Sequence, residues 1–159
     1  GMSKEKRYWH PEIGFNFRLT NLQAALGVAQ LERIEQIIAA KRRNAALYND
    51  LLRSVPGISL PPEAPWAQNV YWMYSVLVED SYGLSRDELM KELKAHDIDS
   101  RPFFYPIHTM PPYVAAAKGQ EFPVATDLSR KGVNLPSSAT LTPQQIRQVC
   151  QVIRDKVEG

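Results

Sequence analysis

Hydrophobic residues recur every three or four positions over residues 22–52, with polar side chains mostly between them. Thr20 and Gln23, just before this stretch, have the spacing of a helix N-terminal capping box. Pro56 follows the stretch and stops a helix. We therefore predict a long helix from Thr20 to shortly before Pro56. Because it is long for one straight helix, we expect a bend or break near residues 38–44, or a helix that leaves the domain to pack on something else.

The middle of the chain predicts alternating strands and helices. Residues 70–78 are rich in β-branched and aromatic side chains, which is typical of a central strand covered on both faces. A second capping box at Ser85 predicts a helix to about His96, followed by a strand over residues 98–103. Prolines make residues 105–112 a loop.

The last third predicts a short helix over residues 123–132, with Gly132 as the left-handed residue after its end. A short extended piece at residues 134–135 follows, and a third capping box at Thr142 opens the final helix. Its inward positions are Ile146, Val149, Val152, Ile153 and Val157. The element order predicts an α/β (α+β) fold, a small sheet covered by helices on one face and preceded by a long helix.

Composition and charge narrow the class of protein. The chain has 159 residues, 44% of them hydrophobic, and a net charge of +2, which indicates an ordinary globular domain rather than a nucleic-acid binder. The short basic clusters near Lys4 and Lys41 are interpreted as solvent-exposed surface charges rather than as a nucleic-acid-binding site. The single cysteine, Cys150, predicts no internal disulfide and no structural metal site. We expect a cytoplasmic protein without a membrane span, and we interpret Gly1 as a tag remnant.

Self-contained catalytic machinery is missing from the sequence. There is no glycine-rich phosphate loop, no G-x-S-x-G elbow and no H-E-x-x-H pattern. Cys150 falls within the final predicted helix, where a packed thiol is expected rather than a nucleophile. We therefore assign no catalytic residue in this chain.

The segment of residues 11–27 has the most distinctive chemistry. Gly14 permits a tight turn, and Asn16 and Arg18 alternate in an extended stretch, so that both point to one side. Two polar side chains between aromatic residues could reach an anion. On the residues alone, capping or surface roles stay open as alternatives.

Together with residues 30–34, this segment resembles a signature of the DegT/DnrJ family of pyridoxal-phosphate-dependent nucleotide-sugar aminotransferases. Weaker similarities follow in the same order at residues 101–108, 122–125 and 134–137. The resemblance implies the small C-terminal domain of a fold-type-I aminotransferase, which usually acts as a homodimer with active sites at the subunit interface.

The same resemblance implies that most of the active site is absent from this sequence. In such enzymes the aldimine-forming lysine and most cofactor contacts lie on a large domain, upstream of the part matching residues 8–14. We therefore expect residues 1–19 to be an irregular lead-in and residues 20–159 to be the small domain, with the large domain absent. No lysine of this chain matches the Schiff-base motif.

Site residues carry over from the resemblance by position. Asn16 matches an asparagine that reaches the cofactor phosphate of the neighbouring subunit, and Arg18 matches the adjacent arginine. His108 matches a histidine near the sugar-nucleotide entrance, and Tyr105 and Arg101 could line the same entrance. The alternative for His108 is an exposed loop histidine with no function. The alternative for Tyr105 and Arg101 is that they serve only packing and solvation.

The resulting hypothesis is a C-terminal fragment of an aminotransferase that moves an amino group from an amino acid to a nucleotide-linked keto sugar, and that is inactive alone. The alternative is a non-catalytic interaction or regulatory module with the same small-domain fold. Both predict self-association, because the apolar side of the helix over residues 22–38 would lack its cover.

Overall fold

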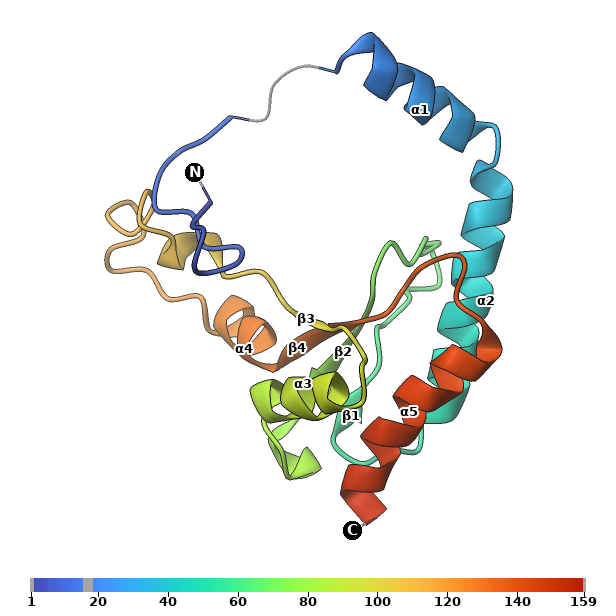
Figure 1. The fold of residues 1–159 in the computed structure, drawn as a ribbon. Helices are drawn as coiled ribbons and strands as arrows, with labels where there is room; N and C mark the ends of the chain where they lie inside the picture. The colour runs from blue at the N-terminus through green and yellow to red at the C-terminus, as the bar shows by residue number, and fades with distance from the viewer. Residues whose placement is uncertain (1, 16–18, 159) are drawn as a thin grey trace. The chain divides into compact units, whose positions relative to one another are not determined.

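Figure 1 shows the fold of a computed structural model, which describes residues 2–15 and 19–158. Within these residues the helices are α1 (Asn21–Leu31), α2 (Ile34–Leu52), α3 (Arg86–Ala95), α4 (Pro123–Lys131) and α5 (Pro143–Glu158). The strands are β1 (Ile58–Ser59), β2 (Tyr74–Val78), β3 (Arg101–Pro102) and β4 (Gly132–Leu135), and short 3-10 helices lie at Asp80–Tyr82 and Ile107–Thr109.

The chain divides into two compact units. Residues 1–32 and 103–130 form the first, which we call the loop unit. Residues 33–102 and 131–159 form the second, which we call the sheet unit because it contains all four strands named above.

The sheet has the strand order β1-β2-β4-β3. All three pairings are antiparallel, and β2 pairs with β4 in a register that places Tyr74 opposite Leu135 and Leu77 opposite Gly132. Alternate residues of β2 point to opposite faces, and Tyr74, Val76 and Val78 are the buried ones.

One hydrophobic core joins this buried face to α2, α3 and α5. α2 and α5 contact each other along their lengths and lie side by side in Figure 1. The fully buried members with larger side chains are Tyr48, Leu52, Tyr74, Val76, Leu89, Leu93, Val133, Ile146, Cys150 and Ile153. The predicted α/β class, a small sheet covered by helices, is confirmed.

Three predicted helix starts are confirmed by hydrogen bonds. At Thr20, Ser85 and Thr142 the side-chain oxygen accepts from the backbone N–H three residues later, and the Gln or Glu at that position accepts from the backbone N–H of the capping residue. A capping box involves only four consecutive residues, so it can be identified from the sequence without knowledge of the tertiary fold. Four of the five predicted inward residues of α5 are buried, and the side chain of Val157 lies outside the described set.

The break in the first long helix was predicted in the wrong place. α1 ends at Leu31 and α2 begins at Ile34, so the chain turns at Glu32 and Arg33 rather than within residues 38–44. Arg33 leaves the helical region with φ −116° and ψ 9°. Neither residue is a glycine or proline, so no residue type typical of turns indicates this break in the sequence.

Both predicted strands of the middle region are shorter than expected. β2 starts at Tyr74 rather than at Val70, because Tyr71 takes a left-handed backbone conformation with φ 47°, which ends any ladder. The face of β2 that carries Ser75 and Leu77 is only half-buried, so the expected cover on both faces is also wrong. β3 has two residues in place of the six predicted over 98–103.

Gly132 has another role than the one predicted. It is the first residue of β4 and pairs with Leu77, and it is not among the glycines with positive φ. α4 therefore ends at Lys131 without a left-handed glycine, and the strand follows directly.

Leucines at buried and exposed helix positions provide a test of this core. Leu52 of α2 is 0% exposed and Leu26 of α1 is 62% exposed. We expect Leu52→Ala to lower the free energy of unfolding by about 3 kcal/mol, and Leu26→Ala to change it by less than about 0.5 kcal/mol. Urea denaturation followed by circular dichroism measures both, and equal losses would contradict the core described above.

Candidate functional site

Arg101, predicted to line a substrate entrance, is the first residue of β3 and pairs with Asn134 of β4. Its side chain is 46% exposed, and its Nη2 lies 3.6 Å from Oδ2 of Asp99, beyond hydrogen-bond distance. Arg101 and Asp99 line a cavity of about 320 Å³ in the sheet unit, which we call the sheet pocket. The residues that line it include Trp72, Asp99, Arg101, Asn134, Pro136 and Ser137.

α2 holds one wall of the sheet pocket through a row of hydrogen bonds. Tyr48 Oη, Lys41 Nζ and Asn44 Nδ2 donate to the carbonyl oxygens of residues 136, 137 and 138, at 3.0, 2.7 and 3.1 Å respectively. The three donors are spaced by three and four residues, so they share one face of the helix. Lys41 Nζ also donates to the carbonyl oxygen of Trp72 at 2.9 Å and so connects two walls of the pocket.

The inner polar side chains of the sheet pocket are already paired. Asn134 is 6% exposed; its Oδ1 accepts from Ser75 Oγ at 2.6 Å, and its Nδ2 donates to the carbonyl oxygen of Pro102 at 3.2 Å. Ser137 Oγ accepts from the backbone N–H of Tyr74 and donates to the carbonyl oxygen of Leu135. The pocket therefore has a fixed inner surface, and its guanidinium and indole groups remain exposed.

A hydrogen-bond network holds the segment that leads into Trp72. Glu63 Oε1 accepts from the backbone N–H of Asn69 and from Arg42 Nη1, and Glu63 Oε2 accepts from the Tyr71 hydroxyl at 2.9 Å. Arg42 also donates to the carbonyl oxygen of Asn69. The N–H of Asn69, then the Tyr71 hydroxyl and Arg42, hold the pKa of the Glu63 carboxyl below its usual range. This network stabilises the left-handed backbone at Tyr71, next to Trp72.

The Glu63 network predicts a pH-dependent contribution to stability. A carboxyl whose pKa is lowered by folding stabilises the protein above its unfolded pKa, near 4.5, and the stabilisation is lost as pH falls through the lower folded value. Glu63→Gln should therefore be less stable than the parent chain at about pH 7, and the difference should shrink toward about pH 3.

Urea denaturation at both pH values measures this effect. Glu121→Gln is the matched control, because Glu121 is exposed and outside the network, and it should match the parent chain at both values. A Glu63→Gln deficit that does not depend on pH would show that the ionised carboxylate is not what the network needs.

Tyr105, the second predicted entrance residue, lies in an aromatic cluster of the loop unit. Its ring meets the ring of Trp9 edge-on at a centroid distance of 5.6 Å, and Tyr8 packs on Phe104 at 4.5 Å. Lys6 Nζ lies 4.2 Å from the Trp9 ring centroid and 4.6 Å from that of Tyr105. The N-terminal segment is thereby bound to the loop that follows β3.

A second cavity, of about 230 Å³, lies within this aromatic cluster, and we call it the loop pocket. The residues that line it include Tyr8, His10, Phe104, Tyr105, Met110 and Tyr113. The backbone N–H of His10 donates to Met110 Sδ at 3.4 Å. An irregular segment was predicted here, and the pocket residues were not. The adjacent Tyr8 and Trp9, before His10 and Pro11, are the sequence signal for an aromatic contact.

His108, the third predicted entrance residue, is half-buried in the 3-10 helix of the loop unit. Its ring stacks on Phe122 at a centroid distance of 4.6 Å, and its Nε2 lies 3.5 Å from Thr126 Oγ1. His108 is not among the residues that line the loop pocket. Thus Tyr105 and His108 belong to the loop unit, whereas Arg101 belongs to the sheet unit.

Asn16 and Arg18, the predicted cofactor-binding residues, lie outside the described residues. Their roles at the cofactor phosphate therefore stay a prediction. The capping box at Thr20 fixes the start of the following helix at Asn21, three positions after Arg18 in the sequence.

Comparison with known proteins decides the family. The family model described as the DegT/DnrJ/EryC1/StrS aminotransferase family matches residues 1–154. The chain belongs to this aminotransferase family. It is 41% identical to a GDP-perosamine synthase of Vibrio cholerae over 155 residues, which cover 98% of this chain and 42% of that enzyme. It is 30% identical to a dTDP-4-amino-4,6-dideoxy-D-glucose transaminase of Escherichia coli, over 91% of this chain and 40% of that enzyme.

Solved aminotransferase structures share the fold. DesV of S. venezuelae, in complex with a ketimine intermediate, superposes with a TM-score of 0.81 at 30% identity, over 98% of this chain and 41% of that one. A family member from Brucella abortus gives a TM-score of 0.76 at 28% identity, over 95% of this chain and 39% of that one. The chain thus spans about two-fifths of the length of the relatives it matches.

The aminotransferase family implies pyridoxal phosphate, which needs a lysine amine able to form a covalent bond. Lys41 Nζ is partly buried, which lowers its pKa, but it already donates to two carbonyl oxygens. Lys131 and Lys156 form ion pairs with Glu79 at 2.9 Å and Glu92 at 2.8 Å. The other described lysines are exposed. The described residues therefore do not form a complete cofactor site, and no step through the cofactor is assigned to them.

The described part of this aminotransferase chain gives little support for a thiol nucleophile or a metal site. Burial raises the pKa of the Cys150 thiol to about 12, so the thiolate needed for nucleophilic attack is disfavoured. Among residues 2–15 and 19–158, no group of three or more His, Cys, Asp or Glu side chains is arranged to hold a metal ion. No helix within these described residues has the length and the apolar composition of a membrane span.

Proposed function

We propose that this chain is the C-terminal part of a pyridoxal-phosphate-dependent aminotransferase that transfers an amino group from an amino acid to a nucleotide-linked keto sugar. The observation that carries the proposal is the family match along residues 1–154, combined with relatives of which this chain covers only about two-fifths. The described lysines support the same view, because none is placed to hold the cofactor. The lysine that does so would belong to the other part of the enzyme.

The relatives also support a particular nucleotide sugar. Three relatives between 38% and 41% identical to this chain are GDP-perosamine synthases. We therefore propose a GDP-linked amino sugar as the product. Tyr105 and His108 from the loop unit, and Arg101 from the sheet unit, would serve as substrate-binding residues. Asn16 and Arg18 would reach the cofactor phosphate in a cytoplasmic homodimer.

A chimera tests the proposed function directly. The part of the Vibrio cholerae enzyme that precedes the matched region is joined to this chain, and product formation is followed by mass spectrometry with L-glutamate and the keto-sugar precursor of GDP-perosamine. We expect the chimera to form the amino sugar and the 159-residue chain alone to form none. Treating the chain with pyridoxal phosphate and borohydride should label no single lysine.

A substitution of His108 within the chimera tests its proposed role in substrate binding. His108→Phe keeps an aromatic ring against Phe122 but removes both ring nitrogens, so kcat/KM for the keto sugar should fall about tenfold through the loss of one polar contact. Amination by the chain alone, or a selectively labelled lysine in it, would contradict the assignment of the cofactor lysine to the missing part.

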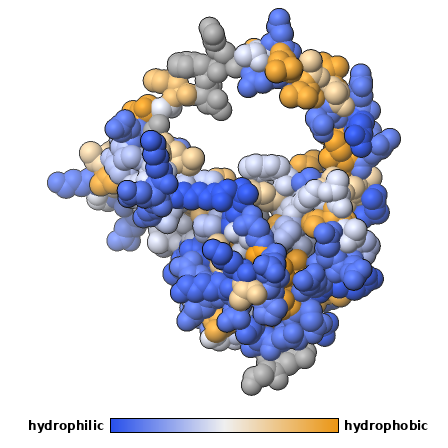
Figure 2. All heavy atoms as spheres, viewed as in Figure 1, coloured by the Kyte–Doolittle hydropathy of each residue, from blue (hydrophilic) through white to orange (hydrophobic). Residues whose placement is uncertain are grey.

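A second function, as a non-catalytic interaction module, is favoured by one observation. α1 contains no Asp, Glu, Lys or Arg, and none of its residues is buried. Its leucines are exposed by between 62% and 75%, and Figure 2 shows hydrophobic side chains along this helix. A helix that is apolar and neutral to this extent is normally covered by protein.

Self-association through α1 can be measured by analytical ultracentrifugation over a range of concentrations. Leu22 and Leu26 are four residues apart and lie on one face of the helix. The double substitution Leu22→Gln and Leu26→Gln should weaken association at least about tenfold, since each buried leucine contributes about 1.5–3 kcal/mol. Val124→Gln, at another exposed apolar position, should have little effect, and a monomeric parent chain would exclude self-association through α1.

A further inference from the structure

Two contacts at the N-terminal end of α4 define the position of the His108 ring. One face of the imidazole stacks on the ring of Phe122, at a centroid distance of 4.6 Å and an interplanar angle of 26°. The Nε2 atom of His108 lies 3.5 Å from Oγ1 of Thr126. Ser129, three residues further along α4, donates through its Oγ to the carbonyl oxygen of Phe104 at 2.9 Å. The helix is thereby attached both to His108 and to the segment before it.

The hydroxyl proton of Thr126 is already used within the helix. Thr126 Oγ1 lies 3.0 Å from the carbonyl oxygen of Phe122, four residues earlier, and it must be the donor because a carbonyl oxygen can only accept. Threonines in helices commonly form this bond. Thr126 Oγ1 can therefore meet His108 only as an acceptor. It follows that Nε2 of His108 carries the proton in their contact.

A proton on Nε2 leaves the other ring nitrogen of His108 as an acceptor. A neutral imidazole carries one proton, so Nδ1 then has a free lone pair. Within residues 2–15 and 19–158, no protein group hydrogen-bonds to this Nδ1, and no carboxylate forms an ion pair with the ring. Asp127, an acidic neighbour on α4, forms an ion pair with Arg130 at 3.0 Å. The polar atom that His108 has available is therefore a hydrogen-bond acceptor.

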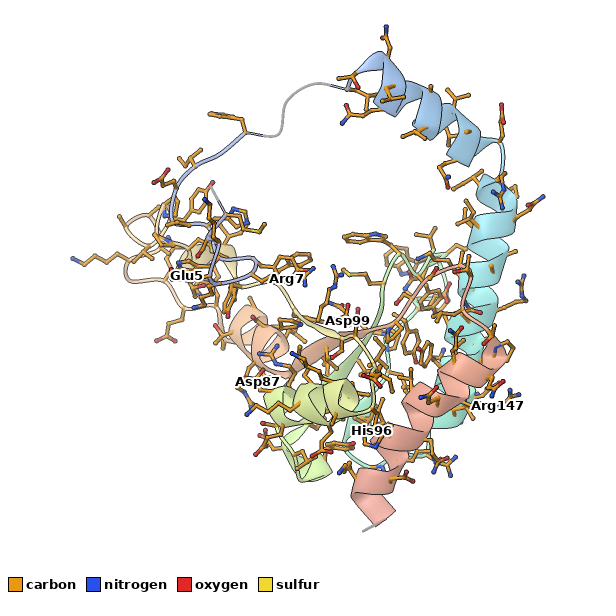
Figure 3. The ribbon with its side chains drawn as sticks, in the orientation of Figure 1. Glu5, Arg7, Asp87, His96, Asp99 and Arg147 are labelled. Atoms are coloured by element: carbon orange, nitrogen blue, oxygen red, sulfur yellow. The ribbon has the colours of Figure 1, made fainter. Side chains whose placement is uncertain are left out.

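The same reasoning gives His96 the opposite proton position. His96 lies at the C-terminal end of α3, where Figure 3 shows its side chain. Its Nδ1 lies 2.9 Å from the carbonyl oxygen of Glu92. Because this oxygen can only accept, the neutral His96 ring carries its proton on Nδ1. His96 is thus an internal reference for the form of His108.

We propose that Thr126 is a positioning residue that holds His108 with its proton on Nε2, so that Nδ1 accepts a hydrogen bond from the nucleotide-sugar substrate. The uncharged donors of such a substrate are the hydroxyl groups of its two sugar rings and the amino group of a guanine base. Its ionised phosphate groups only accept, and His108 in this form has no donor left for them. The proton position rests on the contacts alone, whereas its partner in the substrate rests on the proposed function.

Nitrogen nuclear magnetic resonance of the 159-residue chain measures the proton position, because protonated and unprotonated ring nitrogens differ widely in chemical shift. The chain has three histidines, and His108→Phe and His96→Phe assign two of the rings by the loss of their signals. At about pH 8.5, where unperturbed histidines are neutral, we expect the proton on Nε2 in His108 and on Nδ1 in His96. Thr126→Val removes the hydroxyl and should give a mixture of both forms at His108, whereas Thr126→Ser should restore the parent spectrum.

Two controls accompany these spectra. No residue of α4 is buried, so the Thr126 variants should remain folded, and circular dichroism checks this. Thr140→Val removes an exposed hydroxyl of the sheet unit and should leave the His108 signals as in the parent chain. A proton on Nδ1 of His108 in the parent chain, or an unchanged spectrum in Thr126→Val, would overturn the proposal.

Kinetics of the chimera test the partner of Nδ1. Thr126→Val should raise KM for the keto sugar about fivefold and leave kcat unchanged, because the hydroxyl acts only through His108, and Thr126→Ser should restore KM. Substrate analogues that lack a ribose hydroxyl, a hexose hydroxyl or the guanine amino group distinguish the possible donors.

One analogue should bind about tenfold more weakly than the full substrate to the parent chimera, but equally well to the His108→Phe chimera. That analogue identifies the group that Nδ1 accepts from. If every analogue loses the same affinity in both chimeras, His108 accepts from none of these groups and the proposal fails.

The two sets of measurements separate failure of this proposal from failure of the proposed function. The histidine spectra need only the 159-residue chain. If they agree with expectation but the chimera does not aminate a sugar, the proton position stands and its partner in a nucleotide sugar falls. If the chimera is active but Thr126→Val changes neither the spectrum nor KM, the proposed function stands without a role for Thr126.

Discussion

The row of donors on α2 is the interaction on which the sheet unit depends. Tyr48, Asn44 and Lys41 bind three successive carbonyl groups of residues 136–138, just after β4. Tyr48 is also fully buried and stacks on Tyr74 at a centroid distance of 4.5 Å, so the same helix face packs on the central strand. Burial raises the pKa of the Tyr48 hydroxyl, which keeps it a neutral donor. One helix face thereby sets both the core and the backbone beside the sheet pocket.

This constraint explains how irregular backbone becomes a defined wall. Tyr71 occupies a left-handed conformation that is unfavourable for a bulky residue, and such conformations persist only where the surroundings hold them. Here Glu63 accepts from the Tyr71 hydroxyl on one side, and Lys41 binds the carbonyl oxygen of Trp72 on the other. The exposed indole ring of Trp72 is thus carried by backbone that is fixed before any ligand arrives, which is where functional sites commonly keep local strain.

Local sequence patterns predicted the helix starts and the fold class, but tertiary contacts decided the rest. The capping boxes are complete within four residues, so Thr20, Ser85 and Thr142 could be identified directly. The start of β2 depends on a contact between Tyr71 and Glu63, and the turn between α1 and α2 has no glycine or proline to mark it. The entrance residues came from a motif, yet their partners, such as Trp9 for Tyr105 and Asp99 for Arg101, are set by folding.

The energetics of α1 differ from those of the sheet unit. Isolated helices shorter than about 12–15 residues are marginal in water, and α1 has 11 residues, none of them buried. Its capping box contributes only about 1 kcal/mol, and without charged side chains it gains nothing from ion pairs along its surface. By contrast, the described buried side-chain nitrogen and oxygen atoms all have hydrogen-bond partners. The sheet unit thus satisfies its core and its buried polar groups from within the described chain, whereas α1 needs a covering surface for stability.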